Sequence, residues 1–210
     1  MKPDYKQDNL KLYRADCMEV MSQYDDNYFD LAVVDPPYGI GINKQSGFGT
    51  FKNNKNWDNS IPTDEYFLEL QRVSKNRIIW GGNYFLDYLS NTKCLLIWDK
   101  MNGTNDLADC EIAWNSFNKP IRMFKMHHFS AGYDKKIHPT QKPIKLYSWI
   151  YNLYAEEGQK ILDTHLGSGS NAISAHYAKM GEFVGCELDE DYFKASVERI
   201  RKETRQLELF

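Results

Sequence analysis

The sequence predicts an α/β fold built on a mainly parallel sheet with helices on both faces. Short, continuously apolar runs recur along the chain, and stretches with apolar residues at helical spacing separate several of them. Such runs are typical of strands buried on both faces, and their alternation with helices is typical of a parallel sheet. The predicted strands are residues 11–16, 31–35, 77–80, 95–99, 112–114, 160–163 and 183–187, and the predicted helices are 66–73, 145–154, 171–178 and 191–202.

Length and composition favour one soluble domain. The chain has 210 residues, within the ~100–200 residues that commonly form a domain. No apolar run approaches the ~20 residues needed to cross a bilayer, and the charged start of the chain lacks the apolar stretch of a secretory signal. The four cysteines have no metal-ligand spacing. We therefore expect a cytoplasmic protein with reduced thiols and no metal site.

Two stretches do not fit the alternating pattern. Residues 39–60 are rich in Gly, Asn and Lys and nearly free of aliphatic side chains, and residues from about 117 to 137 show no clear period. Long irregular segments inside a compact domain are usually functional. We expect both stretches to be binding elements of the single domain.

A glycine-rich turn follows the predicted strand 160–163 and precedes a predicted helix. Gly167 and Gly169 allow a tight turn and a close approach of a ligand to the backbone, and the helix N-terminus behind them favours an anionic or hydrogen-bonding group. Glu187 ends the next predicted strand, 20 residues after Gly167, where a carboxylate accepts ribose hydroxyls in nucleotide-binding folds. The turn alone is equally compatible with a plain connection. Together with Glu187 it predicts a pocket for an adenosine-containing cofactor.

The position of this turn predicts a circularly permuted sheet. Only 43 residues follow Gly167, which is enough for a helix, a strand and a final helix. The remaining strands must therefore come from the N-terminal side. A nicotinamide dehydrogenase normally carries its glycine fingerprint early, so the arrangement counts against that class.

The tetrapeptide Asp35-Pro36-Pro37-Tyr38 follows the predicted strand 31–35, at the strand end where open α/β sheets bind ligands. Two prolines make a rigid turn with free carbonyl groups. An amino group on a nucleobase is a poor nucleophile because its lone pair is delocalised into the ring. The Asp35 carboxylate and the Pro36 carbonyl are two acceptors that can hold both N–H protons and direct the lone pair at an electrophile, while Tyr38 stacks on the base.

These motifs resemble those of S-adenosylmethionine-dependent DNA amino-methyltransferases of the β group, the permuted class in which Asp-Pro-Pro-Tyr precedes the glycine-rich motif. The resemblance covers most of the chain and is closest to compact phage and prophage members. It implies a Rossmann-like methyltransferase sheet. The segment Asp163–Ser170 resembles the motif Asp-Pro-Phe-x-Gly-Ser-Gly-Thr of that family, but Thr164 and His165 replace the usual Pro and Phe.

The resemblance also implies a set of residues around S-adenosylmethionine. An acidic residue before the tetrapeptide lies by the cofactor adenine in the family, the segment ahead of the glycine turn holds the methionine end, and the acid after the next strand accepts the ribose. The implied cofactor residues are Asp16, Cys17, His138, Thr140, Gln141, Lys142, Asp163, His165, Leu166, Gly167, Gly169, Ser170, Asn171 and Glu187.

With aspartate leading the tetrapeptide, the resemblance favours N6 of adenine in DNA as the methyl acceptor. The geometry at an amino group is the same in cytosine, so N4 of cytosine and an RNA substrate stay open as alternatives. A base inside a duplex must be flipped out to be reached. A nicotinamide-dependent oxidoreductase would explain the glycine turn but not Asp35–Tyr38, and an idle DNA- or clamp-binding module would not need an intact pocket.

The net charge of −3 is unevenly distributed. Residues 118–145 contain seven Lys and Arg against one Asp, a net charge of +6, which leaves −9 on the rest of the chain. We expect phosphate contacts from this segment and from the loop 39–60, with a solvated basic loop as the plainer alternative. The predicted DNA-binding residues are Lys44, Lys52, Lys55, Arg122, Lys125, Lys135 and Lys136.

The tail 204–210 ends in Gln206-Leu207-Glu208-Leu209-Phe210, which is unusually apolar for a chain end. It resembles the Gln-Leu-x-Leu-Phe signature by which bacterial replication proteins bind the sliding clamp, a short-motif mode of binding. Packing of the tail on its own domain is an almost equally good alternative. A possible partner is therefore the bacterial sliding clamp, contacted by Gln206, Leu207, Leu209 and Phe210.

Overall fold

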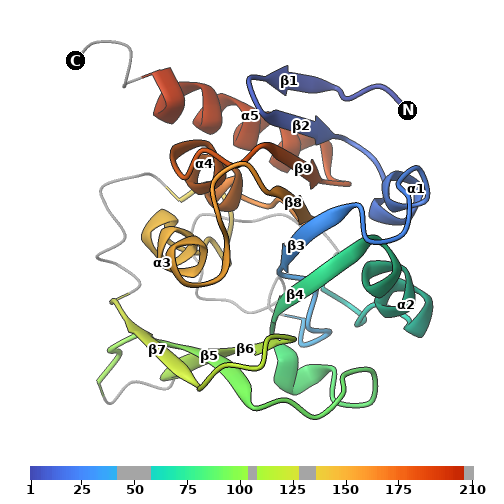
Figure 1. The fold of residues 1–210 in the computed structure, drawn as a ribbon. Helices are drawn as coiled ribbons and strands as arrows, with labels where there is room; N and C mark the ends of the chain where they lie inside the picture. The colour runs from blue at the N-terminus through green and yellow to red at the C-terminus, as the bar shows by residue number, and fades with distance from the viewer. Residues whose placement is uncertain (42–57, 104–107, 128–135, 206–210) are drawn as a thin grey trace.

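The computed structural model describes residues 1–41, 58–103, 108–127 and 136–205. Within these ranges nine strands form one sheet in the order β1-β2-β9-β8-β3-β4-β6-β5-β7 (Figure 1). The strands are β1 (Tyr5–Gln7), β2 (Leu10–Tyr13), β3 (Phe29–Val34), β4 (Ser74–Trp80), β5 (Cys94–Asp99), β6 (Cys110–Asn115), β7 (Arg122–Lys125), β8 (Lys160–Asp163) and β9 (Glu182–Cys186).

The centre of the sheet is parallel. Strands β2, β9, β8, β3 and β4 run in the same direction, with Leu31 of β3 opposite Ile161 of β8 and Val33 opposite Ile78 of β4. The antiparallel pairs are β1–β2 at one edge and β4–β6 and β6–β5 toward the other, where β7 adds in parallel to β5. The prediction of a mainly parallel sheet is confirmed.

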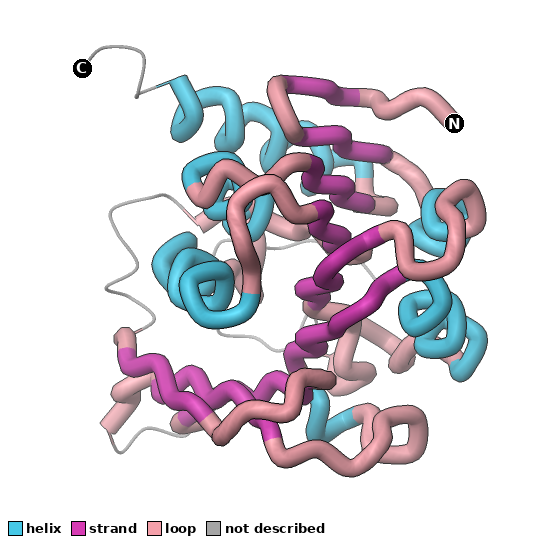
Figure 2. The backbone as a smooth tube through the Cα atoms, viewed as in Figure 1, coloured by secondary structure: helices cyan, strands magenta, loops and turns pink. Residues whose placement is uncertain are grey.

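Helices cover both faces of the sheet, as predicted (Figure 2). They are α1 (Cys17–Met21), α2 (Asp64–Val73), α3 (Ile144–Tyr154), α4 (Ser170–Tyr177) and α5 (Glu190–Arg205), with a short 3₁₀ helix η2 (Gly82–Tyr84). Side chains of α3, α4 and α5 pack with Val33 and Ile78 in one apolar core. Side chains of α1 and α2 pack with Ala32 and Ile79 in the other. Alternation along each strand thus supplies two cores, because successive side chains point to opposite faces.

The chain order positions a crevice at the ends of β3 and β8. Strand β3 leads through α2 to β4 on one side, whereas β8 leads through α4 to β9 on the other. The two connections diverge from neighbouring parallel strands, which makes this the topological switch point where open α/β sheets bind ligands. Because β8, α4 and β9 come last in the chain and β3 comes early, the sheet has the predicted permuted order.

Four of the described elements are not predicted from the sequence, namely β1, α1, η2 and β7. β1 and α1 are three and five residues long, too short to show a period. β7 lies inside the stretch 117–137 that lacks a clear period, so part of the predicted recognition insert is an edge strand of the sheet. Its inner residue Phe124 packs against Trp149 of α3, whereas Ile121 and Met123 are exposed. In the ranges that the structure describes, no helix has the length and apolarity needed to span a membrane.

Candidate active site

A pocket opens at the switch point between β3 and β8. It is lined by the tetrapeptide after β3, by the segment that precedes α3, and by the turn between β8 and α4. The lining residues are Asp35, Pro37, His138, Thr140, Gln141, Lys142, Tyr147, His165, Leu166, Gly167, Ser168, Ser170 and Glu187. Segments that are far apart in the sequence therefore meet in one site, as the two motifs predicted.

The glycine turn has the backbone that the sequence predicts. Gly167 and Gly169 have φ angles of +50° and +74°, in the left-handed region that favours glycine. A Cβ atom at Gly169 would lie 2.9 Å from Cδ1 of Ile200 on α5, so the turn also needs the absence of a side chain there. Gly169 is the N-cap of α4 and, as a glycine, offers no side chain to cap the helix. The first residue of α4, Ser170, lines the pocket, so the helix N-terminus lies at the pocket wall.

Glu187 is tied to this turn by the backbone. Its Oε2 accepts a hydrogen bond of 2.9 Å from the Gly167 amide, and its Oε1 accepts one of 3.0 Å from the Asp189 amide. Burial raises the pKa of Glu187 above the ordinary value, and the two amides oppose that shift. Glu187 therefore lies at the pocket wall, held by backbone amides. A carboxyl group in this position can accept hydrogen bonds from the hydroxyl groups of a ligand.

Asp163 and Asn171 connect the two strand ends. The Asn171 amide nitrogen donates to Oδ2 of Asp163 at 2.9 Å and to the Val33 carbonyl at 3.0 Å, so it links β8 to β3. Tyr151 of α3 donates to the Asn171 amide oxygen at 2.5 Å and fixes that orientation. Burial raises the pKa of Asp163 to about 7. Neither side chain lines the pocket, so both support it from behind.

Thr164 and His165, which depart from the family motif, form a hydrogen-bonded chain with Tyr66 of α2. The Tyr66 hydroxyl lies 2.7 Å from Thr164 Oγ1, which lies 2.9 Å from His165 Nδ1. Burial lowers the pKa of His165 to about 4, so the imidazole is neutral at physiological pH. His165 lines the pocket and, as a neutral imidazole of low pKa, is poorly suited to act as a general base.

The tetrapeptide is fixed by contacts from outside it. The Tyr38 hydroxyl donates to Oδ1 of Asp35 at 2.6 Å, and the amides of Tyr38 and Gly39 both donate to Oδ1 of Asp58 at 2.9 Å. The Tyr38 ring stacks on Tyr84 of η2, with centroids 4.9 Å apart and planes at 15°. Behind the ring, a Cβ atom at Gly81 would lie 2.2 Å from Tyr38 Cε1, so only glycine fits there.

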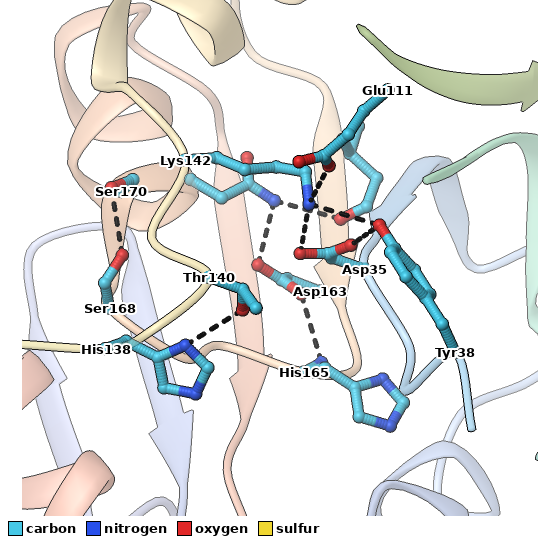
Figure 3. A network of polar contacts seen from close by, with 12 residues as sticks. Asp35, Tyr38, Glu111, His138, Thr140, Lys142, Asp163, His165, Ser168 and Ser170 are labelled. Atoms are coloured by element: carbon cyan, nitrogen blue, oxygen red, sulfur yellow. Dashed lines mark hydrogen bonds and ion pairs between the residues drawn. The ribbon is translucent and has the colours of Figure 1, made fainter. Parts of the chain in front are cut away.

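Lys142, which the sequence analysis counts among the cofactor residues, lines the pocket and contacts the tetrapeptide. Its ammonium lies 2.5 Å from Oδ2 of Asp35, 3.0 Å from Oε2 of Glu111 on β6 and 3.3 Å from the Tyr38 hydroxyl (Figure 3). The cause is topological, because β6 lies beside β4 and brings a carboxylate over the end of β3. No sequence signal marks Glu111, which lies in a plain strand.

The other predicted cofactor residues fall into two groups, those that line the pocket and those that do not. Thr140 Oγ1 lies 3.1 Å from Nδ1 of His138, whose ring packs edge-on against Tyr192 of α5. Asp16 is the N-cap of α1 and accepts a 2.8 Å hydrogen bond from the Met18 amide. Asp16, Cys17, Pro36 and Tyr38 are not among the described lining residues, whereas Tyr147 and Ser168 line the pocket without having been predicted.

The predicted DNA and partner residues are only partly within the described ranges. Arg122 and Lys125 are exposed on the edge strand β7, and Lys125 forms an ion pair of 3.7 Å with Asp99. Burial lowers the pKa of Lys136. Lys44, Lys52, Lys55, Lys135 and the tail residues Gln206, Leu207, Leu209 and Phe210 lie outside the described residues.

Comparison with known proteins gives the family. A family model described as DNA methylase matches residues 92–198, which is half of the chain. The chain belongs to this DNA methylase family. The match begins before β5 and ends within α5, so it includes Glu111, Lys142 and the glycine turn.

Relatives of this DNA methylase are similar over nearly the whole chain. The type II methyltransferase M.HpaI of Haemophilus parainfluenzae is 22% identical, over 92% of this chain and 74% of that protein. The type II methyltransferase M2.MboI of Moraxella bovis is 24% identical, over 97% of this chain and 93% of that protein.

Solved structures show the same fold. The M1.HpyAVI complex with S-adenosylmethionine has a TM-score of 0.64 at 20% identity, over 90% of this chain and 99% of that chain. The cytosine-N4-specific PvuII DNA methyltransferase has a TM-score of 0.66 at 14% identity, over 98% of this chain and 95% of that chain. The Rossmann-like methyltransferase fold predicted for this DNA methylase is therefore confirmed.

Proposed function

We propose that this DNA methylase transfers the methyl group of S-adenosylmethionine to N6 of an adenine flipped out of duplex DNA. One observation carries the proposal. The Asp35 carboxylate, at the end of β3, lines the same pocket as the glycine turn and Glu187, at the ends of β8 and β9. An acceptor for an amino group and a site for an adenosine-containing cofactor are thus adjacent, which a transfer between two bound molecules requires.

The chemistry of the donors and acceptors in this pocket fits S-adenosylmethionine. Glu187 offers a carboxyl group for ribose hydroxyls, and the N-terminus of α4 with Ser168 and Ser170 offers hydrogen-bond donors for a carboxylate. When bound, the cofactor supplies a methyl group on a sulfonium, an electrophile that needs no further activation. Support for the same cofactor comes from the M1.HpyAVI neighbour, which was solved with it.

The base end of the pocket supplies orientation. Asp35 and the Pro36 carbonyl accept the two N–H groups of the amine, so that its lone pair is directed at the methyl carbon. Tyr38 supports the face of the base, and its own plane is fixed by Tyr84. Transfer would then be a direct in-line displacement, in which the amine nitrogen bonds to the methyl carbon as the sulfonium–methyl bond breaks and the thioether leaves, without a covalent enzyme intermediate. The methylated amine is strongly acidic and loses its proton without a general base, so the neutral His165 is not needed for that step.

The aspartate at the head of the tetrapeptide supports adenine as the target. The fold does not distinguish the bases, since the PvuII neighbour is cytosine-N4-specific. N4 of cytosine is therefore the second candidate. Tritiated S-adenosylmethionine and duplex DNA, followed by nucleoside analysis, separate the two, and we expect the label in N6-methyldeoxyadenosine. Asp35→Ala should abolish the labelling, whereas the exposed Asp25→Ala should not. Absence of label in DNA, or equal labelling by Asp35→Ala, would refute the proposal.

Phosphate contacts of the basic segment are proposed to hold the duplex. Among the described residues, Arg122 and Lys125 project from an exposed edge strand. Removal of one phosphate contact reduces the salt slope of DNA binding by about 1. Arg122→Ala should therefore show a shallower slope, and Arg201→Ala on α5 serves as the matched control. An unchanged slope in Arg122→Ala would exclude that contact.

The interaction of residues 206–210 with a sliding clamp stays a prediction. Deletion of Gln206–Phe210 should abolish retention by an immobilised clamp and leave methyl transfer intact. Loss of folding with unchanged clamp retention would instead favour packing of the tail on its own domain.

A further inference from the structure

Lys142 is a buried cation at the base end of the pocket. It is only 3% exposed, which is unusual because lysine is almost never buried without partners. An ammonium group has three N–H donors, and three acceptors lie around it: Asp35 Oδ2 at 2.5 Å, Glu111 Oε2 at 3.0 Å and the Tyr38 hydroxyl at 3.3 Å. Asp35 and Tyr38 accept hydrogen bonds from Lys142, and Glu111 forms an ion pair with it, so its contacts are made with residues around the tetrapeptide.

Glu111 holds Lys142 from the opposite side. Its second oxygen, Oε1, lies 2.7 Å from the ammonium of Lys100, which follows β5. Burial is the largest single effect on Glu111 and raises its pKa, but Lys142 and Lys100 together outweigh it and lower the pKa to about 2, so this carboxylate is charged throughout the physiological range. Both carboxylates raise the pKa of Lys142 against the effect of burial. The four side chains thus form a network with two positive and two negative charges.

The Asp35 carboxylate is fixed at both oxygens. Oδ2 is paired with Lys142, and Oδ1 accepts from Tyr38. Each carboxylate oxygen has two lone pairs, so one position on each remains for an incoming amino group. An ionised carboxylate only accepts hydrogen bonds, whereas a protonated one presents a donor to the base. Asp35 must therefore be an anion to hold the amine.

The surroundings of Asp35 oppose this charge. Burial is the largest effect on Asp35 and raises its pKa, and Glu111 raises it further. The groups that face Asp35 are Tyr38 in its own turn, Glu111 on β6, Lys142 before α3, Tyr147 on α3 and Asp163 on β8. Of these five groups, Lys142 is the cation.

We propose that Lys142, held by Glu111, is a positioning residue for methyl transfer that keeps the Asp35 carboxylate anionic and fixes the edge that it presents to the base. The proposal rests on the proposed function, because it gives Asp35 the target amino group as its ligand. It reassigns Lys142 from the cofactor to the base end of the pocket. Nothing in the role requires Lys142 to touch S-adenosylmethionine.

The test is the pH dependence of single-turnover transfer, with saturating S-adenosylmethionine and DNA, between pH 5 and 9. Lys142→Met should lower the plateau rate at least about 100-fold and move the acidic limb upward by one pH unit or more, because an opposite charge nearby shifts a carboxyl pKa by about 1–3 units. Lys142→Arg keeps the cation and should restore the position of the limb. The matched control is Lys75→Met, which removes a Lys–Asp pair of 2.7 Å at the far end of β3 and should change neither quantity.

Glu111→Gln provides the opposite shift. It removes a negative neighbour of Asp35 and leaves Lys142 in place, so the acidic limb should move to lower pH. Asp163 also has a raised pKa, but its causes are burial, Asn171, the His165 amide, Asp35 and Glu187, and they do not include Lys142 or Glu111. Opposite shifts of the acidic limb in the Lys142 and Glu111 variants therefore identify Asp35 as the titrating group. A packing role for Lys142 would not produce two shifts of opposite sign.

Binding of S-adenosylmethionine, measured by calorimetry, completes the design. We expect its Kd to change less than about threefold in all four variants. If Lys142→Met loses much of its affinity for the cofactor while the acidic limb of its pH profile stays in place, Lys142 is a cofactor-binding residue and the proposal is overturned. A lower rate with an unmoved limb would also overturn it. If Lys142→Met does not fold, an unmoved or raised limb in Glu111→Gln is the refuting result. A wild-type protein that binds the cofactor but labels no base would refute the proposed function itself.

Discussion

The two ends of the pocket achieve polarity in different ways. At the base end, Asp35 is neutralised by Lys142 in a network of alternating charges. At the proposed cofactor end, Glu187 lines the pocket wall and is held by backbone amides, and burial raises its pKa. A carboxylate paired with a cation keeps its position before a ligand arrives. A buried carboxyl group without a cation is stabilised further when a ligand donates hydrogen bonds to it. On the proposed function, the base end is therefore preorganised, and the cofactor end gains its remaining hydrogen bonds when the cofactor binds.

Gly81→Ala tests whether the base end depends on a fixed Tyr38, and its expected effect is the largest among the variants that compare the two ends. The new Cβ would overlap the Tyr38 ring and force it to move. Misplacement of about 1 Å costs roughly 100-fold in rate, so we expect a loss of at least that size in single-turnover transfer.

Cofactor affinity should be unchanged in this variant. Gly158→Ala is the control, because Gly158 also has a positive φ angle but no atom lies within 4 Å of the place that its Cβ would take. Both variants should lose stability from backbone strain, and only Gly81→Ala should lose transfer. Equal transfer rates in the two would show that Tyr38 need not be held in place.

Glu187→Ala tests the cofactor end. The change removes the acceptor of the Gly167 amide and a carboxyl group from the pocket wall. Hydrogen bonds to a charged group contribute about 1.5–3 kcal/mol, so the Kd for S-adenosylmethionine should rise about 10- to 100-fold. Calorimetry measures this directly, and the exposed Glu190→Ala is the control. The rate of transfer at saturating cofactor should stay near that of the wild type. A lower transfer rate with an unchanged Kd for the cofactor would contradict the assignment of Glu187 to the cofactor end.

Tyr84→Ala should have a smaller effect on the base end. Tyr84 stacks on Tyr38, and aromatic pairs contribute about 0.5–1.5 kcal/mol beyond the area that they bury, which corresponds to a loss of roughly 2- to 10-fold in transfer. Tyr88→Ala removes a similar stack, on Phe67, away from the tetrapeptide. It should leave the rate unchanged. Equal losses in both variants would indicate a general packing effect.

Asp163→Asn tests the pH dependence of stability. In the folded protein Asp163 has a pKa of about 7 instead of 3.8, so between these values the folded state holds a proton that the unfolded chain has lost, and stability falls as pH rises. His165, with a pKa of about 4 instead of 6.5, has the opposite effect over nearly the same range. The two effects offset each other in the wild type.

Removal of the Asp163 contribution exposes that of His165. The free energy of unfolding of Asp163→Asn, relative to wild type, should rise by up to about 1.4 kcal/mol per pH unit between about pH 4.5 and 6.5. Urea unfolding at several pH values measures this, with Asp25→Asn as the control. Parallel curves for Asp163→Asn and wild type would show that Asp163 titrates near its ordinary pKa.

The parts of the molecule that the sequence predicts are those governed by local patterns. Apolar runs locate β3 and β8, and the glycines locate the turn before α4, because backbone conformation and burial are encoded within a few residues. Position in the chain predicts the permuted order. The fold class follows from these signals, as do Asp35, Gly167 and Glu187 in the pocket lining, whereas most of the other lining residues follow from the family resemblance.

The parts that it does not predict depend on contacts between distant segments. Glu111 is an ordinary strand residue until the order β4-β6-β5 brings it over Asp35, and Lys142 belongs to a motif that resemblance assigns to the cofactor. Asp58 shows no motif, although it holds the turn after Tyr38 by two amides. β7 is not predicted because it is an edge strand in which only Phe124 is partly buried, so it lacks the continuous apolar run of a central strand.

The asparagine between the strand ends has a consequence for how the two substrates meet. Asn171 reaches from α4 to the Val33 carbonyl and to Asp163, and Tyr151 locks its amide from behind. The separation of the β3 and β8 ends is thus set by hydrogen-bond lengths inside the protein. On the proposed function, the methyl donor and the acceptor base would therefore meet at a spacing that hydrogen bonds inside the protein determine before either one binds.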